Sequence, residues 1–237
     1  MLTQIFSSLQ DFFLLVDTET SGLPKNWSAP YADEKSWPYI IQFAWIIYDK
    51  NYNEVKRENH YINNNDFKIA QSSQNIHHIT KDYLVAHGED RKNVMLKFEE
   101  DVENYKPLII GHFMEFDYHM INVEYERIGV SSIFKKQPFF CTMKASAPFV
   151  KNPSVELLKL NAFYAELFDE EPKASHNALS DALNTAKIFF HLLTSGQINQ
   201  SVIASQDNDF ALERNPSSGI SKARKIINRL FSFVFYG

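Results

Sequence analysis

Cysteine is almost absent from this sequence of 237 residues, in which Cys141 is the only one. A single cysteine excludes a fold stapled by disulfides within the chain and favours an intracellular setting, so we expect a cytoplasmic protein. The N-terminus also lacks a basic segment followed by an apolar core, so no signal peptide is predicted. No stretch approaches the apolar length of a membrane span, so integral membrane association is not expected.

An excess of basic charge is missing as well. The chain carries 24 Lys and Arg against 29 Asp and Glu, which gives a net charge of −5. This balance argues against a protein that holds nucleic acid through a large basic surface. It is compatible with an enzyme that binds a few nucleotides through metal ions. Aromatic residues are plentiful, with 20 Phe and 11 Tyr, and we expect most of these rings in the core.

The most informative stretch is an apolar run, residues 12–16, that leads into two acids and a turn containing glycine. Such a run predicts a strand buried on both faces of a sheet. Asp17 and Glu19 are two positions apart, so on a strand their carboxylates point to the same face. A divalent cation, Mg²⁺ or Mn²⁺, would relieve their repulsion. The alternative is that one acid caps the turn and the other is solvated.

The rest of the chain alternates strand and helix patterns, which predicts an α/β fold with a mixed sheet. Residues 39–49 and 54–62 are expected to continue an antiparallel meander, and 107–112 and 139–141 to add buried strands, the first of them parallel. We expect helices over 89–105, 115–128 and 177–193, and a further helix capped by Ser154. Residues 23–38 are predicted to be a loop and 75–80 a turn.

Composition divides the chain into three parts. Residues 1–195 are expected to form one domain, and 196–219 are polar and aperiodic, which is typical of a linker. Residues 220–237 form a basic amphipathic segment without acids. This segment could dock on a partner protein, lie on an anionic membrane surface, contact nucleic acid or pack back on the domain.

Further acids occur where later strands give way to helices. Asp117 lies in the first turn of the helix that follows the strand ending at His112, and the helix dipole alone would favour an acid there. His176 and Asp181 are five residues apart at the start of the last long helix. The small residues Ala178 and Ala182 flank Asp181 and would let this helix approach the sheet closely.

In combination these residues resemble the DEDDh family of 3′→5′ exonucleases, the proofreading-type, DnaQ-like enzymes. The segments that carry the resemblance are Asp17-Thr-Glu-Thr-Ser-Gly-Leu23, Gly111-His112-x-x-x-Phe116-Asp117 and His176-x-Ala178-x-x-Asp181. The resemblance extends from residue 12 to about 193, so it makes 1–195 an exonuclease domain. It implies a ribonuclease H-like, mixed five-stranded sheet flanked by helices. One short motif often arises by chance, but the probability of a chance match falls with each further motif that agrees, and here three separated motifs agree.

The resemblance also implies the roles of individual residues. Two divalent cations would be bound by the carboxylates of Asp17, Glu19, Asp117 and Asp181. His176 would be the general base, because a histidine can accept a proton near neutrality. Substrate would be held by Thr18, Thr20, Leu23, His77 and Phe113.

The expected substrate is the 3′ end of single-stranded nucleic acid, DNA rather than RNA, in proofreading or repair, with a polymerase as a candidate partner of the C-terminal segment. An RNA-trimming enzyme and a non-catalytic nucleic-acid-binding scaffold are the alternatives. Two residues depart from the family pattern, since Phe113 replaces a common Asn and Gln42 replaces a common Glu. Neither is one of the implied metal ligands.

Overall fold

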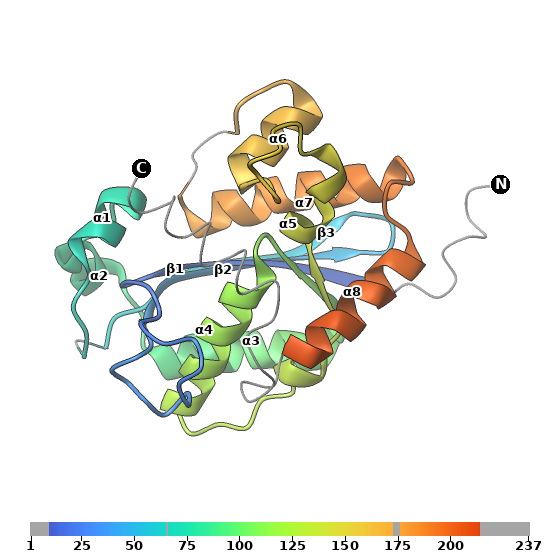
Figure 1. Cartoon of the computed structure of the whole chain (residues 1–237). Helices are drawn as coiled ribbons and strands as arrows, with labels where there is room; N and C mark the ends of the chain where they lie inside the picture. The colour runs from blue at the N-terminus through green and yellow to red at the C-terminus, as the bar shows by residue number, and fades with distance from the viewer. Residues whose placement is uncertain (1–9, 65, 173–175, 214–237) are drawn as a thin grey trace.

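A five-stranded mixed sheet organises the described part of the chain, which in this computed structural model comprises residues 10–64, 66–172 and 176–213 (Figure 1). The strands are β1 (Phe12–Thr20), β2 (Ile40–Asp49), β3 (Glu54–Tyr61), β4 (Leu108–Gly111) and β5 (Phe139–Cys141), in the spatial order β3-β2-β1-β4-β5. The first three strands form an antiparallel meander, whereas β1, β4 and β5 run parallel. The predicted fold class is confirmed.

The central strand β1 is buried on both faces, as its apolar run predicts. Leu14 and Val16 belong to a core cluster on one face of the sheet, and Phe13 and Leu15 belong to a second cluster on the other face. Because side chains alternate along a strand, Asp17 continues the face of Phe13 and Leu15. The acid is thereby directed to the second of these two faces.

Helices cover both faces of the sheet (Figure 1). Helices α3 and α4 contribute to the cluster of Leu14, and α6 and α7 to the cluster of Phe13. The helices are α1 (Gln71–His77), α2 (Lys81–His87), α3 (Arg91–Tyr105), α4 (Met114–Arg127), α5 (Thr142–Ala145), α6 (Leu160–Phe168), α7 (Ala178–Thr194) and α8 (Gln200–Glu213), with 3-10 turns at Phe134–Lys136 and Ala147–Phe149. Among the described residues, no helix has the length and apolarity needed to cross a membrane.

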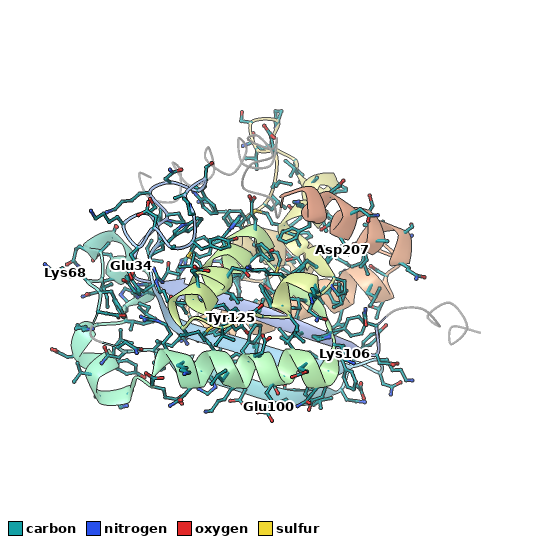
Figure 2. All side chains as sticks on the ribbon, turned by 90° about the horizontal axis from the view of Figure 1, so that it is seen from below. Glu34, Lys68, Glu100, Lys106, Tyr125 and Asp207 are labelled. Atoms are coloured by element: carbon teal, nitrogen blue, oxygen red, sulfur yellow. The ribbon has the colours of Figure 1, made fainter. Side chains whose placement is uncertain are left out.

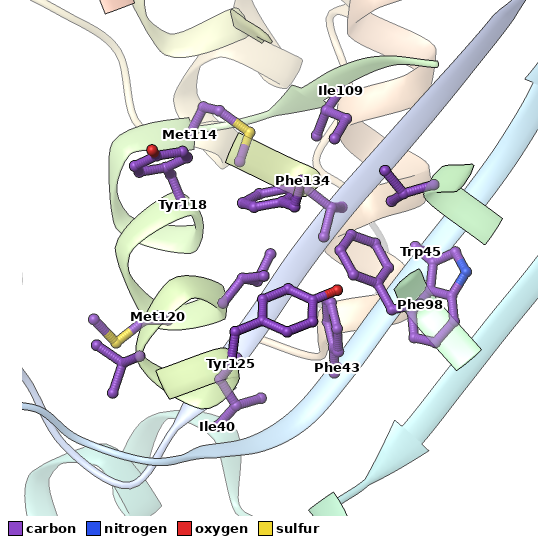
Figure 3. Packing of buried hydrophobic residues seen from close by; sticks show 14 of the residues in the cluster. Ile40, Phe43, Trp45, Phe98, Ile109, Met114, Tyr118, Met120, Tyr125 and Phe134 are labelled. Carbon is purple, nitrogen blue, oxygen red and sulfur yellow. The ribbon is translucent and has the colours of Figure 1, made fainter. Parts of the chain in front are cut away.

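Aromatic side chains fill the space between the sheet and helices α3 and α4 (Figure 3). The ring of Phe98 lies 4.8 Å from that of Phe43 and 5.2 Å from that of Trp45, centroid to centroid. The indole nitrogen of Trp45 donates a hydrogen bond to Asp101 Oδ2 at 2.8 Å, so its polar atom is satisfied within the core. The abundance of phenylalanine is thus explained by the core, as expected.

Helix α8 corrects the prediction of an aperiodic linker over 196–219. Residues 200–213 are helical, with Ile203 and Phe210 buried against the body. Two polar side chains of α8 accept hydrogen bonds from the backbone of strand β5: Gln206 from the Cys141 amide and Asp207 from the Phe139 amide, both at 3.0 Å. These contacts hold the helix on the sheet without a long apolar stripe, so the sequence pattern did not show it. The segments 214–219 and 220–237 lie outside the described residues.

Two local predictions are also wrong. Ser154 caps no helix, because its amide donates to Asn152 Oδ1 at 2.9 Å in a turn, and α6 begins at Leu160. The expected turn over 75–80 is in part helix α1, which ends at His77 and is followed by His78 in the left-handed conformation. The helices over 91–105, 114–127 and 178–194 agree with the predicted ones within two residues at each end.

Candidate active site

Three carboxylates converge at the carboxyl end of β1. Asp17 and Glu19 come from the strand itself, and Asp181 comes from the first turn of α7. One oxygen of each side chain lies within 4.8 Å of those of the other two. The predicted pairing of Asp17 with Glu19 on one strand face therefore occurs, and Asp181 joins them as expected.

The start of α7 is held in place by polar contacts. Asn177 caps the helix by accepting from the Ser180 amide at 3.3 Å, and the side-chain oxygen of Gln42 accepts from the Ala178 amide at 3.2 Å. Gln42 is fully buried and pairs in register with Glu19 across β1 and β2. The residue that departs from the family pattern thus links the strand of the acids to the helix of the third acid.

Asp117 reaches the site from the opposite face of the sheet. Its helix, α4, packs on the face of Val16, and Oδ1 of Asp117 accepts a hydrogen bond from the Thr18 hydroxyl at 2.7 Å. Asp117 is buried, with 2% of its surface exposed. The Asp117 charge raises the pKa of both Asp17 and Glu19, so the Asp117 carboxylate lies close enough to interact with both acids.

The electrostatics of the four acids show a strong need for positive charge. Burial, and then the charges of the neighbouring acids, raises the pKa of Asp17 well above its usual range and that of Glu19 to about 8. Burial raises the pKa of Asp117 to about 7, although hydrogen bonds from Thr18 oppose the shift. Burial also raises the pKa of Asp181 to about 6. In the absence of cations the protein must therefore protonate these groups or tolerate their repulsion.

The residues fit a divalent cation. Carboxylate oxygens are the ligands that Mg²⁺ and Mn²⁺ prefer, and three of them meet at one point. Asp181 Oδ2 accepts from the His176 amide at 3.0 Å, but its Oδ1 is buried and accepts no hydrogen bond of normal geometry from the described residues. The nearby Asn184 side chain lowers the pKa of Asp181 without forming a hydrogen bond of good geometry to this oxygen. A cation would supply the charge that a buried carboxylate needs.

His176 stands at the mouth of the same cavity. Its side chain is exposed and its backbone has φ of +63°, a left-handed conformation outside the following helix. Partial burial lowers the pKa of His176, and the positive charges of His78 and Lys159 lower it further. The imidazole is therefore neutral at pH 7 and able to accept a proton.

A cavity of about 250 Å³ opens beside the acids. All five residues predicted to hold substrate line it: Thr18, Thr20, Leu23, His77 and Phe113. His77 accepts from the Ile79 amide through Nδ1 at 3.0 Å, which places its proton on Nε2, and burial lowers its pKa to about 4. The structure thus brings the predicted residues together, while their roles toward a substrate stay predictions.

Sequence reasoning missed several residues that line this cavity. Lys159 is the only lysine among the described residues of this lining, and it precedes α6, a helix whose start was predicted incorrectly. Ser73 comes from the part of helix α1 that precedes the predicted turn over 75–80. No signal in the sequence pointed to Lys159, whereas a better prediction of α1 would have drawn attention to Ser73.

A five-stranded mixed sheet with acids at the carboxyl end of its central strand defines a nuclease of the ribonuclease H-like fold. The sequence profile of the exonuclease family, RNase T, matches residues 14–189, well over half of the chain, so the chain belongs to the exonuclease family. No curated protein matches the chain.

Solved structures of exonucleases share the fold. Exonuclease I of E. coli, in complex with a dT13 oligonucleotide, is 19% identical with a TM-score of 0.63, and the match covers 77% of this chain and 41% of that one. A 3′-exonuclease that recognises the histone mRNA stem-loop is 16% identical with a TM-score of 0.63, over 83% of this chain and 68% of that one. Cell-death related nuclease 4 is 16% identical with a TM-score of 0.60, over 79% and 65%. The chain spans about two fifths of the exonuclease I chain it matches.

Proposed function

We propose that this protein is a metal-dependent 3′→5′ exonuclease that removes nucleotides from the 3′ ends of single-stranded nucleic acid, with DNA as its substrate. The observation that carries the proposal is the convergence of Asp17, Glu19 and Asp181 within 4.8 Å, with Asp117 acting on the same point. Membership of the exonuclease family supports the same conclusion.

In the proposed reaction a water molecule attacks the terminal phosphodiester, the bond from phosphorus to the 3′-oxygen breaks, and a nucleoside 5′-monophosphate leaves. Two divalent cations, Mg²⁺ or Mn²⁺, would neutralise the phosphate, acidify the water and stabilise the departing oxygen. Asp17, Glu19, Asp117 and Asp181 would hold these ions. His176 accepts the proton of the attacking water, because its depressed pKa keeps the imidazole neutral at pH 7.

The cavity beside the acids accommodates the terminal nucleotide. Its volume of about 250 Å³ and its largely apolar lining beside the acids suit one nucleotide rather than a duplex end. Leu23 projects from the loop after β1 and would act as a wedge against the last base, while His77 and Phe113 lie on the same lining. Phe113 also lies 6.1 Å from the Phe116 ring in a stacked arrangement, which fixes its position.

RNA is the second candidate substrate. A structure with the same fold is that of a 3′-exonuclease described as recognising a histone mRNA stem-loop, whereas exonuclease I was solved with dT13. Discrimination depends on contacts to the 2′-hydroxyl. The proposed setting is cytoplasmic, in DNA replication or repair, with a polymerase as the proposed partner of segment 220–237.

The test is incubation of single-stranded DNA and RNA, each labelled at the 5′ end, with Mg²⁺ or Mn²⁺. We expect a ladder of products shortened from the 3′ end, faster for DNA, and loss of this ladder in Asp17→Asn. The matched control is Glu100→Gln, an exposed acid on the outer side of α3 (Figure 2), which should leave the ladder unchanged.

Binding of either polymer without shortening, under both metals, would favour the non-catalytic scaffold instead. Faster shortening of RNA would reassign the substrate but leave the reaction in place. Deletion of residues 215–237 should leave turnover of short substrates intact if that segment serves a partner, and a collapse of turnover would contradict that role.

A further inference from the structure

A second cavity adjoins the candidate active site. It has a volume of about 580 Å³ and shares Gly22 and Leu23 with the first cavity. Its walls are the loop between β1 and β2 and residues 66–70. Ser21 joins these two segments, because its carbonyl accepts from the Ala70 amide at 2.8 Å and its hydroxyl accepts from the Tyr39 amide at 2.9 Å. The cavity is therefore a fixed extension of the pocket that contains the acids.

Unpaired positive charge distinguishes this second cavity. Lys25, Lys35 and Lys68 line it, are exposed, and form no ion pair within the described part of the chain. The acids on the same lining are Glu34 and Asp66, and Figure 2 shows Glu34 and Lys68 at the same end of the molecule. Three lysines against two acids leave an excess of positive charge.

Asp66 contributes little to the field of this cavity. Its two oxygens accept from the guanidinium of Arg91 at 2.7 and 3.0 Å, which neutralises the carboxylate. Partial burial would raise the pKa of Asp66, but the hydrogen bonds and charge of Arg91 outweigh it and lower this pKa, so the carboxylate stays ionised. Among the described residues of this lining, Glu34 is thus the one acid without a cationic partner that faces the three lysines, in a protein whose net charge is −5.

The described aromatic residues of the second cavity, Trp37, Tyr39 and Phe67, leave no ring face for a base. Trp37 is buried and stacked on the His119 ring, with centroids 5.6 Å apart. Tyr39 and Phe67 are stacked on each other with centroids 5.0 Å apart and an angle of 22°. The guanidinium of Arg127 lies 3.7 Å from the Tyr39 centroid, and the ammonium of Lys81 lies 4.4 Å from the Phe67 centroid. A cation so close must lie on the face opposite the stacked ring, because the stacked ring fills the other. Both faces of the Tyr39 and Phe67 rings are therefore occupied.

We propose that Lys25, Lys35 and Lys68 form a subsite that binds backbone phosphates of the single strand on the 5′ side of the terminal nucleotide. This inference rests on the proposed function, since it extends the path of the same substrate. The strand would pass from the acids over Gly22 and Leu23 into the second cavity. Because the rings offer no free face, the subsite reads the phosphate backbone and is indifferent to base identity.

The test compares two substrates of different length. The p-nitrophenyl ester of thymidine 5′-monophosphate fills only the first cavity, whereas an oligothymidylate of about 12 nucleotides reaches the second. In the triple variant Lys25→Gln, Lys35→Gln and Lys68→Gln we expect KM for the oligonucleotide to rise about tenfold or more, with turnover of the ester unchanged. The slope of log affinity against log salt concentration should become shallower by about 2, roughly 0.7 for each lost phosphate contact.

A second triple variant controls for net charge. Lys50→Gln, Lys97→Gln and Lys106→Gln remove the same number of charges from exposed positions outside both cavities, and Figure 2 shows Lys106 far from Lys68. We expect this control to behave as the wild type on both substrates. If both triple variants weaken oligonucleotide turnover equally, or if the first weakens the ester equally, the subsite is overturned.

Binding separates this inference from the proposed function. The affinity of each protein for the labelled oligonucleotide is measured by fluorescence anisotropy with Ca²⁺ over a range of salt concentrations. A wild type that hydrolyses neither substrate contradicts the proposed function, yet a weaker and less salt-dependent binding in the first variant alone would still support the subsite. A wild type that hydrolyses both, with unchanged binding in the first variant, overturns the subsite and leaves the function standing.

Discussion

The side-chain oxygen of Gln42 accepts a hydrogen bond from the backbone amide of Ala178 at 3.2 Å, in a fully buried position. The Gln42 amide nitrogen donates to Asn59 Oδ1 at 2.9 Å. Gln42 therefore sets where α7 begins, and so where Asp181 lies relative to the strand that carries Glu19. A glutamate at position 42 would keep the acceptor but add a charge beside the acids.

Substitution of Gln42 should separate these two effects. Gln42→Ala leaves the buried Ala178 amide without an acceptor, which should cost about 1–3 kcal/mol of stability whether or not Mg²⁺ is present. Without metal, the charge introduced by Gln42→Glu should repel the neighbouring acids and lower the stability of the variant. Mg²⁺ should bring its Tm back to that of the wild type. Thermal unfolding of the three proteins with and without Mg²⁺ measures both. Equal stability of Gln42→Ala and wild type would show that this contact does not hold α7.

The hydroxyl of Thr18 should tune metal binding through Asp117. Thr18→Val removes the donor to Asp117 Oδ1, so the pKa of Asp117 rises further and its carboxylate becomes a weaker ligand at neutral pH. We expect the Mg²⁺ concentration for half-maximal activity to increase about tenfold. Thr18→Ser keeps the hydroxyl and should resemble the wild type. A normal Mg²⁺ requirement in Thr18→Val would contradict the role of this hydrogen bond.

The metal-free protein should lose stability as pH rises. A carboxyl whose pKa is raised by folding binds a proton that the unfolded chain has released, so its contribution to stability is lost as pH rises through the folded pKa. Burial and the charges of neighbouring acids raise the pKa of Glu19 to about 8, and burial raises the pKa of Asp117 to about 7. Burial lowers the pKa of His112 to about 3, so this residue makes stability rise with pH, mainly below its unfolded pKa of about 6.5.

Thermal unfolding in EDTA should therefore show a Tm that falls by a few degrees between about pH 6.5 and pH 8.5. His112 is neutral in the folded state over this range, and in the unfolded state it is half protonated near pH 6.5 and neutral above about pH 7.5, so it opposes the fall in Tm only at the lower end of the range. Asp17→Asn removes a carboxyl whose own pKa is raised well above its usual range by burial and by the charges of neighbouring acids, so the Tm of this variant should fall less. A Tm that rises with pH in the wild type would refute this account of the acids.

Metal addition should reverse that loss. A ligand that binds only the folded state stabilises it by mass action, so saturating Mg²⁺ at about pH 8.5 should raise Tm by about 5 °C or more. The increase should be much smaller in Asp17→Asn. An equal increase in both proteins would indicate that Mg²⁺ binds elsewhere. Glu100→Gln, with its substitution on an exposed face of α3, is the control for changes in surface charge.

Glu124 offers a test of the fold behind the second cavity. It is fully buried, its Oε1 accepts from the Ile40 amide at 2.9 Å, and it pairs with Arg91 and Arg127 at 2.6 Å each. Glu124→Gln would leave two buried guanidinium groups without their shared anion, so we expect a loss of about 3 kcal/mol in urea denaturation. Glu126→Gln on the exposed side of the same helix should have almost no effect, and a similar loss in both variants would contradict this reasoning.

The sequence was sufficient for the sheet and for the cluster of acids. The apolar run before Asp17 needs burial on both faces, and each later acid follows the end of a predicted strand or opens a predicted helix. Parallel strands bring their carboxyl ends to one edge, so Asp117 had to arrive near Asp17 whatever the details of packing. The family motifs then fixed the remaining choices.

What the sequence could not show depends on contacts between distant segments. Helix α8 is held by Gln206 and Asp207 on backbone amides of β5, and neither side chain signals such a role by its type or spacing. Ser154 has the chemistry of a helix cap, but a competing turn uses its amide. The second cavity likewise depends on Ser21, which joins two loops that no local pattern connects.

The contacts of α8 with β5 also affect how the protein behaves toward other chains. Strand β5 lies at one edge of the sheet, and an edge strand presents amides that can pair with a strand of another molecule. Gln206 and Asp207 already occupy the amides of Cys141 and Phe139. Helix α8 thus protects the edge of the sheet from aggregation, and its removal would expose backbone amides that can pair with a strand of another molecule.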